Sequence, residues 1–125
     1  MRRGCVTVLV VLGALAFAPS ANACSCAPVK PGAAIRGADA AFSGELVRVV
    51  PRNRERAVFR YRVRRVFKAG PGIRRGRMVS VLSARSSAAC GLPVRTGRRY
   101  RLALARVDGH WSAGLCSLLR SRCAS

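Results

Sequence analysis

The sequence predicts a small all-β domain, a closed barrel or a sandwich, preceded by an export signal. The chain has 125 residues, which is enough for one domain. Several short segments alternate apolar and polar side chains and are separated by turn residues. No segment after residue 23 has the spacing of a long amphipathic helix. These observations favour a β-domain, and periodicity alone does not separate a barrel from a sandwich.

Residues 1–23 have the features of a secretory signal. Two arginines follow the initiator methionine, and residues 6–18 form an apolar run. This run is shorter than the roughly 20 residues that a membrane-spanning helix needs. Ala21-Asn22-Ala23 has the small-x-small pattern that signal peptidase cuts after, so we expect a secreted domain of residues 24–125. No later stretch is apolar enough to span a membrane.

The expected strands follow one another with turns between them. Residues 59–64 (Phe-Arg-Tyr-Arg-Val-Arg) alternate strictly, and a break at 65–66 predicts a bulge or strong coiling of the strand that returns Val66 to the inner face. The Asp108-Gly109 pair predicts a hairpin. The other expected strands are residues 40–50, 77–83 and 100–105. A short helix is compatible with residues 31–37, and residues 117–122 fit either a short helix or a frayed tail.

The cysteines indicate a disulfide framework. Five remain after the signal, namely Cys24, Cys26, Cys90, Cys116 and Cys123. Their spacing does not match a zinc site, and small exported domains commonly rely on disulfides. An odd number allows at most two bridges and leaves one thiol, so Cys123 has no evident partner. Lipid attachment to Cys24 is an alternative that would leave four cysteines to pair, but the residues before Cys24 are a poor lipoprotein signal.

The chain is strongly basic. It has 24 basic and four acidic side chains and a formal net charge of +20. Such a charge favours acidic polymers or anionic surfaces as partners. A GC-rich genome is the alternative explanation, and it accounts for arginine replacing lysine but not for the scarcity of acids.

Three of the arginines share one strand face. Arg60, Arg62 and Arg64 alternate with Phe59 and Tyr61, which fall on the buried side. A nucleic-acid surface would need exposed aromatic rings among its basic residues. We therefore expect these three arginines to be solvated and not to line a nucleic-acid groove.

The sequence does not support an enzyme or a bound cofactor. His110 is the one histidine and falls in the predicted hairpin turn, where a solvated side chain is expected. The four acidic residues, Asp39, Glu45, Glu55 and Asp108, are scattered along the chain. No general acid–base pair or triad can be assembled from them.

A set of short motifs gives the sequence a family resemblance. Cys24-Ser25-Cys26-Ala27-Pro28 follows the cleavage site directly, and Pro31 to Phe42 comes next. Ala89-Cys90-Gly91 follows a predicted strand. Tyr100 to Ala103, Asp108-Gly109 and Cys116-Ser117 complete the series. In this order and spacing, the motifs resemble the tissue inhibitors of metalloproteinases and the netrin-like module that these inhibitors use.

The resemblance implies a fold and a pairing of the cysteines. The fold would be a five-stranded OB-type barrel with the N-terminal segment strapped across it. The implied disulfides are Cys24–Cys90 and Cys26–Cys116. The implied function is that of a secreted inhibitor of zinc metalloendopeptidases.

The resemblance also implies a role for each residue at the N-terminus. The α-amine and carbonyl oxygen of Cys24 would chelate the zinc of the protease, and Ser25 would enter its specificity pocket. Cys26, Ala27 and Pro28 would form a wedge, with Ser87, Ala88 and Ala89 as an adjacent ridge. A catalytic zinc keeps one coordination position open. An α-amine with a reference pKa of about 7.7–8.0 is partly neutral near pH 7 and can fill it.

The sequence also departs from these inhibitors. Arg36 stands where they carry a further cysteine, and the loop of residues 51–56 is short. The second subdomain of the animal inhibitors is absent from this chain. Netrin-like modules also occur in proteins that inhibit no protease. The alternative is therefore a non-inhibitory extracellular module that recognises acidic polymers or another protein through its basic surface.

Overall fold

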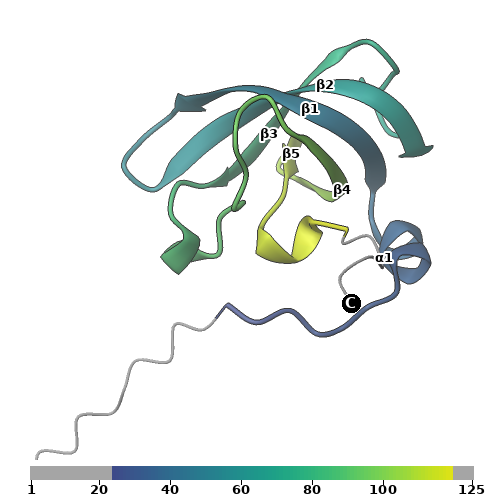
Figure 1. Cartoon of the computed structure of the whole chain (residues 1–125), viewed down its shortest axis with the longest axis horizontal. Coiled ribbons are helices and arrows are strands. Elements are labelled where there is room, and N and C mark those ends of the chain that lie inside the picture. Colours follow the sequence, from purple (N-terminus) through teal and green to yellow (C-terminus); the bar gives the residue numbers. More distant parts are fainter. Residues whose placement is uncertain (1–23, 120–125) are drawn as a thin grey trace, which may run out of the picture.

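The protein folds into a closed five-stranded barrel (Figure 1). The structure is a computed structural model and describes residues 24–119, so the expected signal and residues 120–125, with Cys123, lie outside it. The strands are β1 (Ala40–Pro51), β2 (Arg56–Lys68), β3 (Met78–Ala84), β4 (Arg99–Val107) and β5 (His110–Ser112). The helical elements are α1 (Pro31–Gly37) and two 3-10 turns, η1 (Ser87–Ala89) and η2 (Leu115–Ser117). The expected all-β barrel of OB type is confirmed.

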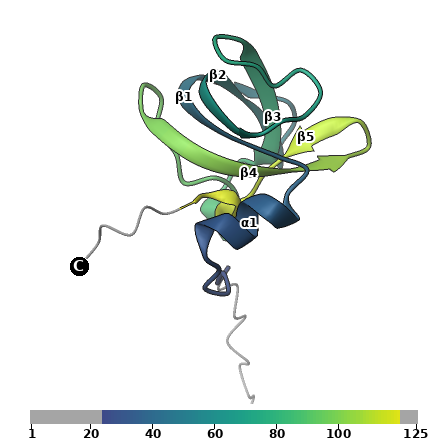
Figure 2. The same cartoon turned by 90° about the vertical axis from the view of Figure 1, so that its right-hand side faces the viewer.

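The strand order around the barrel is β1-β2-β3-β5-β4, and β4 returns to β1. β1 is thus paired with β2 on one side and β4 on the other, both antiparallel (Figure 2). β3 and β5 form the one parallel pair among the described strands, with Val81 opposite Trp111. This short pairing closes the barrel and distinguishes it from a sandwich.

The alternation in β2 is confirmed, and its irregularity lies one residue earlier than expected. Ser43 of β1 is opposite Arg65, but the next residue, Gly44, is opposite Val63. Arg64 is therefore the extra residue of a bulge. A second register shift follows at Phe67, and Val66 between the two packs against the core.

The barrel interior is filled by apolar side chains that alternate along the strands. The rings of Phe42 and Tyr61 meet edge to face, with centroids 5.7 Å apart and planes at 70°. Leu46, Val81 and Leu102 are completely buried around them. Burying each such side chain stabilises the fold by about 1.5–3 kcal/mol relative to exposure.

The turns confirm the hairpin and correct the C-terminal expectation. Asp108 and Gly109 both have positive φ, 49° and 76°, as the hairpin between β4 and β5 requires. The helix expected from residue 117 does not form over the described residues. Leu118 instead pairs with Leu102 of β4, and the N–H of the next residue donates to the carbonyl oxygen of Arg101 (2.9 Å).

The helix expected at residues 31–37 is confirmed as α1. Pro31 occupies its first turn, where no intrahelical N–H is required. At its other end the Lys68 ammonium donates to the carbonyl oxygens of Arg36 (3.0 Å) and Ala38. A cation at a helix C-terminus satisfies otherwise unpaired carbonyls, so α1 is tied to the end of β2. No helix within residues 24–119 is long and apolar enough to cross a membrane.

Candidate functional site

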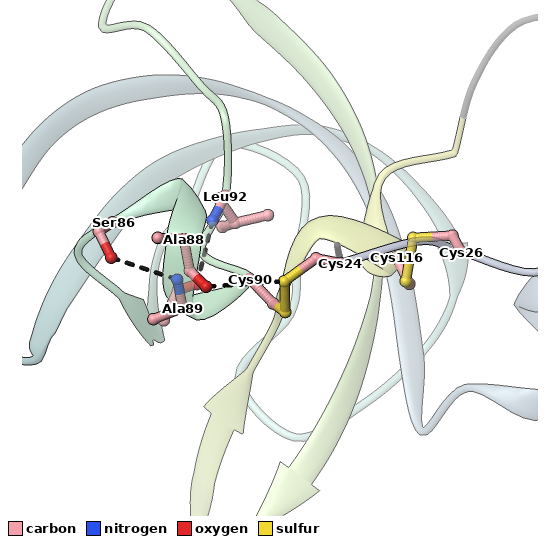
Figure 3. The surroundings of a disulfide bond; sticks show 9 residues. Cys24, Cys26, Ser86, Ala88, Ala89, Cys90, Leu92 and Cys116 are labelled. Atoms are coloured by element: carbon pink, nitrogen blue, oxygen red, sulfur yellow. Dashed lines mark hydrogen bonds between the residues drawn. A yellow bond between two sulfur atoms is a disulfide. The ribbon is translucent and has the colours of Figure 1, made fainter. Parts of the chain in front are cut away.

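The segment of residues 24–30 has no regular secondary structure and runs past one end of the barrel next to η2 (Figure 1). Two disulfides hold it there. Cys24 is bonded to Cys90 and Cys26 to Cys116, with Cα–Cα distances of 5.5 and 5.3 Å (Figure 3). Both pairings expected from the resemblance are therefore confirmed. Disulfides of this kind persist in oxidising compartments.

The loop that carries Cys90 is shaped by a tight backbone turn. Ser86 caps η1 through its Oγ, which accepts from the N–H of Ala89 (3.2 Å). Cys90 then adopts a left-handed conformation with φ 61°. At Gly91 a Cβ would collide with the carbonyl oxygen of Ala84 and lie 2.8 Å from that of Ser86. Only glycine fits this approach, which directs Cys90 towards the N-terminal segment.

The two cysteine loops are joined to each other. The N–H of Leu115 donates to the carbonyl oxygen of Cys90 (2.9 Å). Gly114 lies so close that an added Cβ would be 3.0 Å from the same oxygen. The partners of Cys24 and Cys26 are thus held in one rigid unit beneath the segment.

We use the term N-terminal ridge for residues Cys24–Pro28 together with Ser87–Ala89. The Sγ of Cys24 lies 3.9 Å from the carbonyl oxygen of Ala88, so the two parts of the ridge are in contact (Figure 3). Ser25 to Pro28 and all of η1 are exposed. The structure therefore places Cys24 against η1, and Ser25 to Pro28 continue from it as exposed chain.

A hollow of about 640 Å³ lies beside the N-terminal ridge. Its walls come from the segment itself, from α1 and from the chain around η2. The motifs in the sequence include Pro31 and Cys116 of these walls but not the leucines, although the apolar spacing of Leu115, Leu118 and Leu119 around Cys116 was a usable signal. The lining residues are Cys24, Cys26, Ala27, Pro28, Val29, Pro31, Ala34, Leu115, Cys116, Leu118 and Leu119.

The N-terminal ridge carries no charged side chain. Within residues 24–119, no three His, Cys, Asp or Glu side chains are close enough to hold a metal ion. Two of the four acidic groups have partners elsewhere on the barrel: Asp39 Oδ2 accepts from the N–H of Arg106 (2.7 Å), and Glu45 pairs with Arg64. His110 is exposed at the start of β5. Whatever the ridge recognises, it does so through backbone groups and small side chains.

Neither models of known protein families nor curated proteins produce a match to this chain.

Proposed function

We propose that the exported chain, cut after Ala23, is an inhibitor of zinc metalloendopeptidases. The observation that carries the proposal is the anchoring of Cys24. Its side chain is bonded to Cys90, and a second bridge starts only two residues later at Cys26. The first residue of the exported chain is thus fixed on the barrel while its backbone remains available to a partner.

The backbone of Cys24 has the donor atoms that a catalytic zinc accepts. Such a zinc has three protein ligands and an open position for water or substrate. A free α-amine and the carbonyl oxygen of the same residue form a five-membered chelate that can replace the water. Because the two disulfides already restrict this residue, less conformational entropy is lost when it binds.

The shape of the N-terminal ridge suits the cleft of a protease. Its side chains are small, and Ser25 follows the chelating residue and is exposed. Ser87, Ala88 and Ala89 extend the same surface without adding bulk or charge. In a complex Ser25 would enter the specificity pocket, and residues 26–28 would lie along the cleft.

Adding one alanine between Ala23 and Cys24 tests the proposal. The added residue moves the amine away from Cys24 and leaves the barrel and both disulfides intact. Intact mass would first confirm the N-terminal residue, the absence of lipid and the two bridges in both proteins. A panel of zinc metalloendopeptidases would then be assayed with each protein, and a serine protease would serve as the control.

We expect the protein that begins at Cys24 to inhibit at least one member of the panel. The extended protein should be weaker by about 100-fold or more, which corresponds to about 2.7 kcal/mol of binding free energy. Equal potency of the two proteins would exclude chelation by Cys24. No inhibition of any panel member by the protein that begins at Cys24 would exclude the function itself.

A further inference from the structure

Five arginines gather on one outer face of the barrel. They come from two strands that the sequence separates by more than thirty residues, and β1 lies between these strands (Figure 2). All five side chains are exposed. We call this surface the arginine face; it consists of Arg62, Arg64 and Arg65 of β2 and Arg99 and Arg101 of β4.

The strand register places four of these arginines in two rows across β1, and Arg64 is the bulge residue between the rows. Ser43 of β1 is paired with Arg65 on one side and Arg101 on the other. Two residues further along, Glu45 is paired in the same way with Arg62 and Arg99. Neighbouring strands are about 4.8 Å apart, so the Cα atoms of each arginine pair lie about 10 Å apart across β1. This spacing is about one Debye length of 8–10 Å, at which exposed charges are only partly screened from one another.

One carboxylate lies within the rows. Glu45 Oε2 is 3.0 Å from Arg64 Nη2 and is the sole acidic partner that the arginine face has among the described residues. The remaining guanidinium groups are therefore not neutralised by neighbouring acids. Like charges that lie close together repel one another and destabilise the folded chain. An anion that binds here therefore interacts favourably with each of these unpaired guanidinium groups.

We propose that the arginine face binds a linear polymer of phosphate or sulfate groups that carries no bases. The planar guanidinium fork matches two oxygens of a tetrahedral oxyanion. Five such groups on an open sheet suit a chain of repeated anions better than a single small ion. This proposal does not rest on the inhibitor function, because none of the five residues belongs to the N-terminal ridge.

Two further observations decide against other anionic partners. The aromatic ring next to the rows, Phe67, has the guanidinium carbons of Arg65 and Arg101 at 5.5 and 5.9 Å from its centroid. This ring is engaged by cations and is not free to stack on a base. The large apolar side chains that are exposed in the described chain, among them Val49 and Val107, all lie outside the arginine face. The face therefore has no apolar group to insert into a membrane.

A charge-matched pair of double variants tests the proposal in the exported chain. Arg65→Gln with Arg101→Gln removes two charges from the arginine face. Arg74→Gln with Arg75→Gln removes two exposed charges from the loop between β2 and β3. Binding would be measured against inorganic polyphosphate, a sulfated polysaccharide, single-stranded DNA and vesicles of anionic lipid at several salt concentrations. Circular dichroism would confirm that each variant is folded.

We expect Arg65→Gln with Arg101→Gln to weaken binding to polyphosphate or the sulfated polymer by about tenfold. The slope of the logarithm of the binding constant against the logarithm of salt concentration should become less steep by about one for each arginine removed. The loop pair should change affinity less than about twofold. Equal losses in the two double variants would show that net charge alone drives binding and would overturn the proposal. Tighter binding to single-stranded DNA or to vesicles than to both base-free polymers would also overturn it.

A second pair of variants tests whether removing an acidic group raises the affinity for the polymer. Glu45→Gln removes the carboxylate from the arginine face and releases Arg64. Glu55→Gln removes an exposed carboxylate from the β1–β2 turn and changes the net charge equally. We expect tighter polymer binding from Glu45→Gln alone. Equal effects of the two substitutions would contradict a localised site.

Discussion

The backbone N–H of Leu115 donates a hydrogen bond of 2.9 Å to the carbonyl oxygen of Cys90. This contact joins the loop that holds Cys24 to the loop that holds Cys26. The two disulfides therefore do not act as independent tethers. Together with the hydrogen bond, they form a single support for the N-terminal ridge.

The disulfides should contribute similar amounts to stability. They join residues separated by 66 and 90 positions in the sequence. Loop-closure entropy changes slowly with loop length, so Cys24→Ser/Cys90→Ser and Cys26→Ser/Cys116→Ser should each lower the free energy of unfolding by about 2–4 kcal/mol. Urea denaturation measures both. A loss below about 1 kcal/mol for either pair would contradict its supporting role.

Gly91→Ala should destabilise the loop that carries Cys90. The added methyl group would collide with the backbone at Ala84, which cannot move without disturbing β3. We expect the free energy of unfolding to fall by about 2 kcal/mol or more. Gly37→Ala at the end of α1 is the control, because its Cβ meets nothing within 4 Å. There alanine should be neutral or stabilise by up to about 1 kcal/mol. Thermal denaturation measures the change in stability of each variant. Equal changes in Gly91→Ala and Gly37→Ala would contradict the close packing at Gly91.

Tyr61 should make the barrel sensitive to alkaline pH. Burial, with a smaller contribution from the nearby Tyr100, raises the pKa of the Tyr61 phenol well above its ordinary value. The pKa of a tyrosine in the unfolded chain is about 10. Below that pH Tyr61 is neutral in both the folded and the unfolded state, and its full contribution to stability is present. Above that pH the unfolded chain ionises while the folded chain does not. Stability is therefore lost at up to about 1.4 kcal/mol per pH unit.

Tyr61→Phe tests this effect. The Tyr61 hydroxyl is buried and has no hydrogen-bond partner among the described residues. Its removal should therefore cost little, or stabilise by about 1 kcal/mol, near neutral pH. Urea denaturation at pH 8 and at pH 10.5–11 should show that the free energy of unfolding falls less with rising pH in the variant than in the parent protein. Parallel declines would mean that Tyr61 ionises normally in the folded state.

Much of the barrel could be predicted from alternation and turn residues alone. Residues 59–64 and the Asp108-Gly109 pair are local signals, because one strand face and one hairpin are decided by neighbouring residues. The bulge at Arg64 was placed one residue too late because its position depends on the register against Ser43 and Gly44. That register belongs to the partner strand and is not visible in β2 by itself.

The two surfaces differ in how far the sequence could reveal them. The N-terminal ridge was accessible because Cys24 and Cys26 belong to a short motif, and the family that this motif resembles implies their partners Cys90 and Cys116. The arginine face was accessible only in part. Alternation places Arg62 and Arg64 on one face of β2, but the arginines of β4 join them only when β1 pairs with β2 and β4 at once. Arg65 and Arg101 are brought to opposite sides of Ser43 by that closure. No local pattern in the chain records it.

Ala88→Arg should separate the proposed inhibition from stability. The Ala88 side chain is exposed, and its carbonyl oxygen lies 3.9 Å from Cys24 Sγ. A long cation there would obstruct the approach of a protease to the chelating residue, so we expect inhibition to weaken by about tenfold or more while the melting temperature is unchanged. Thr96→Arg, an exposed substitution in the turn before β4, is the matched control. Equal potency of the two variants would remove Ala88 from the site.

We propose that the Cys24 backbone coordinates the zinc of a protease. Visible absorption of an inhibited metalloendopeptidase whose zinc is replaced by cobalt tests it most directly, because the spectrum of cobalt responds to its ligands. Saturating amounts of the protein that begins at Cys24 should change the cobalt bands as an amine nitrogen and a carbonyl oxygen replace water. The alanine-extended protein should leave them unchanged. An unaltered spectrum in the presence of the inhibiting protein would contradict the claim.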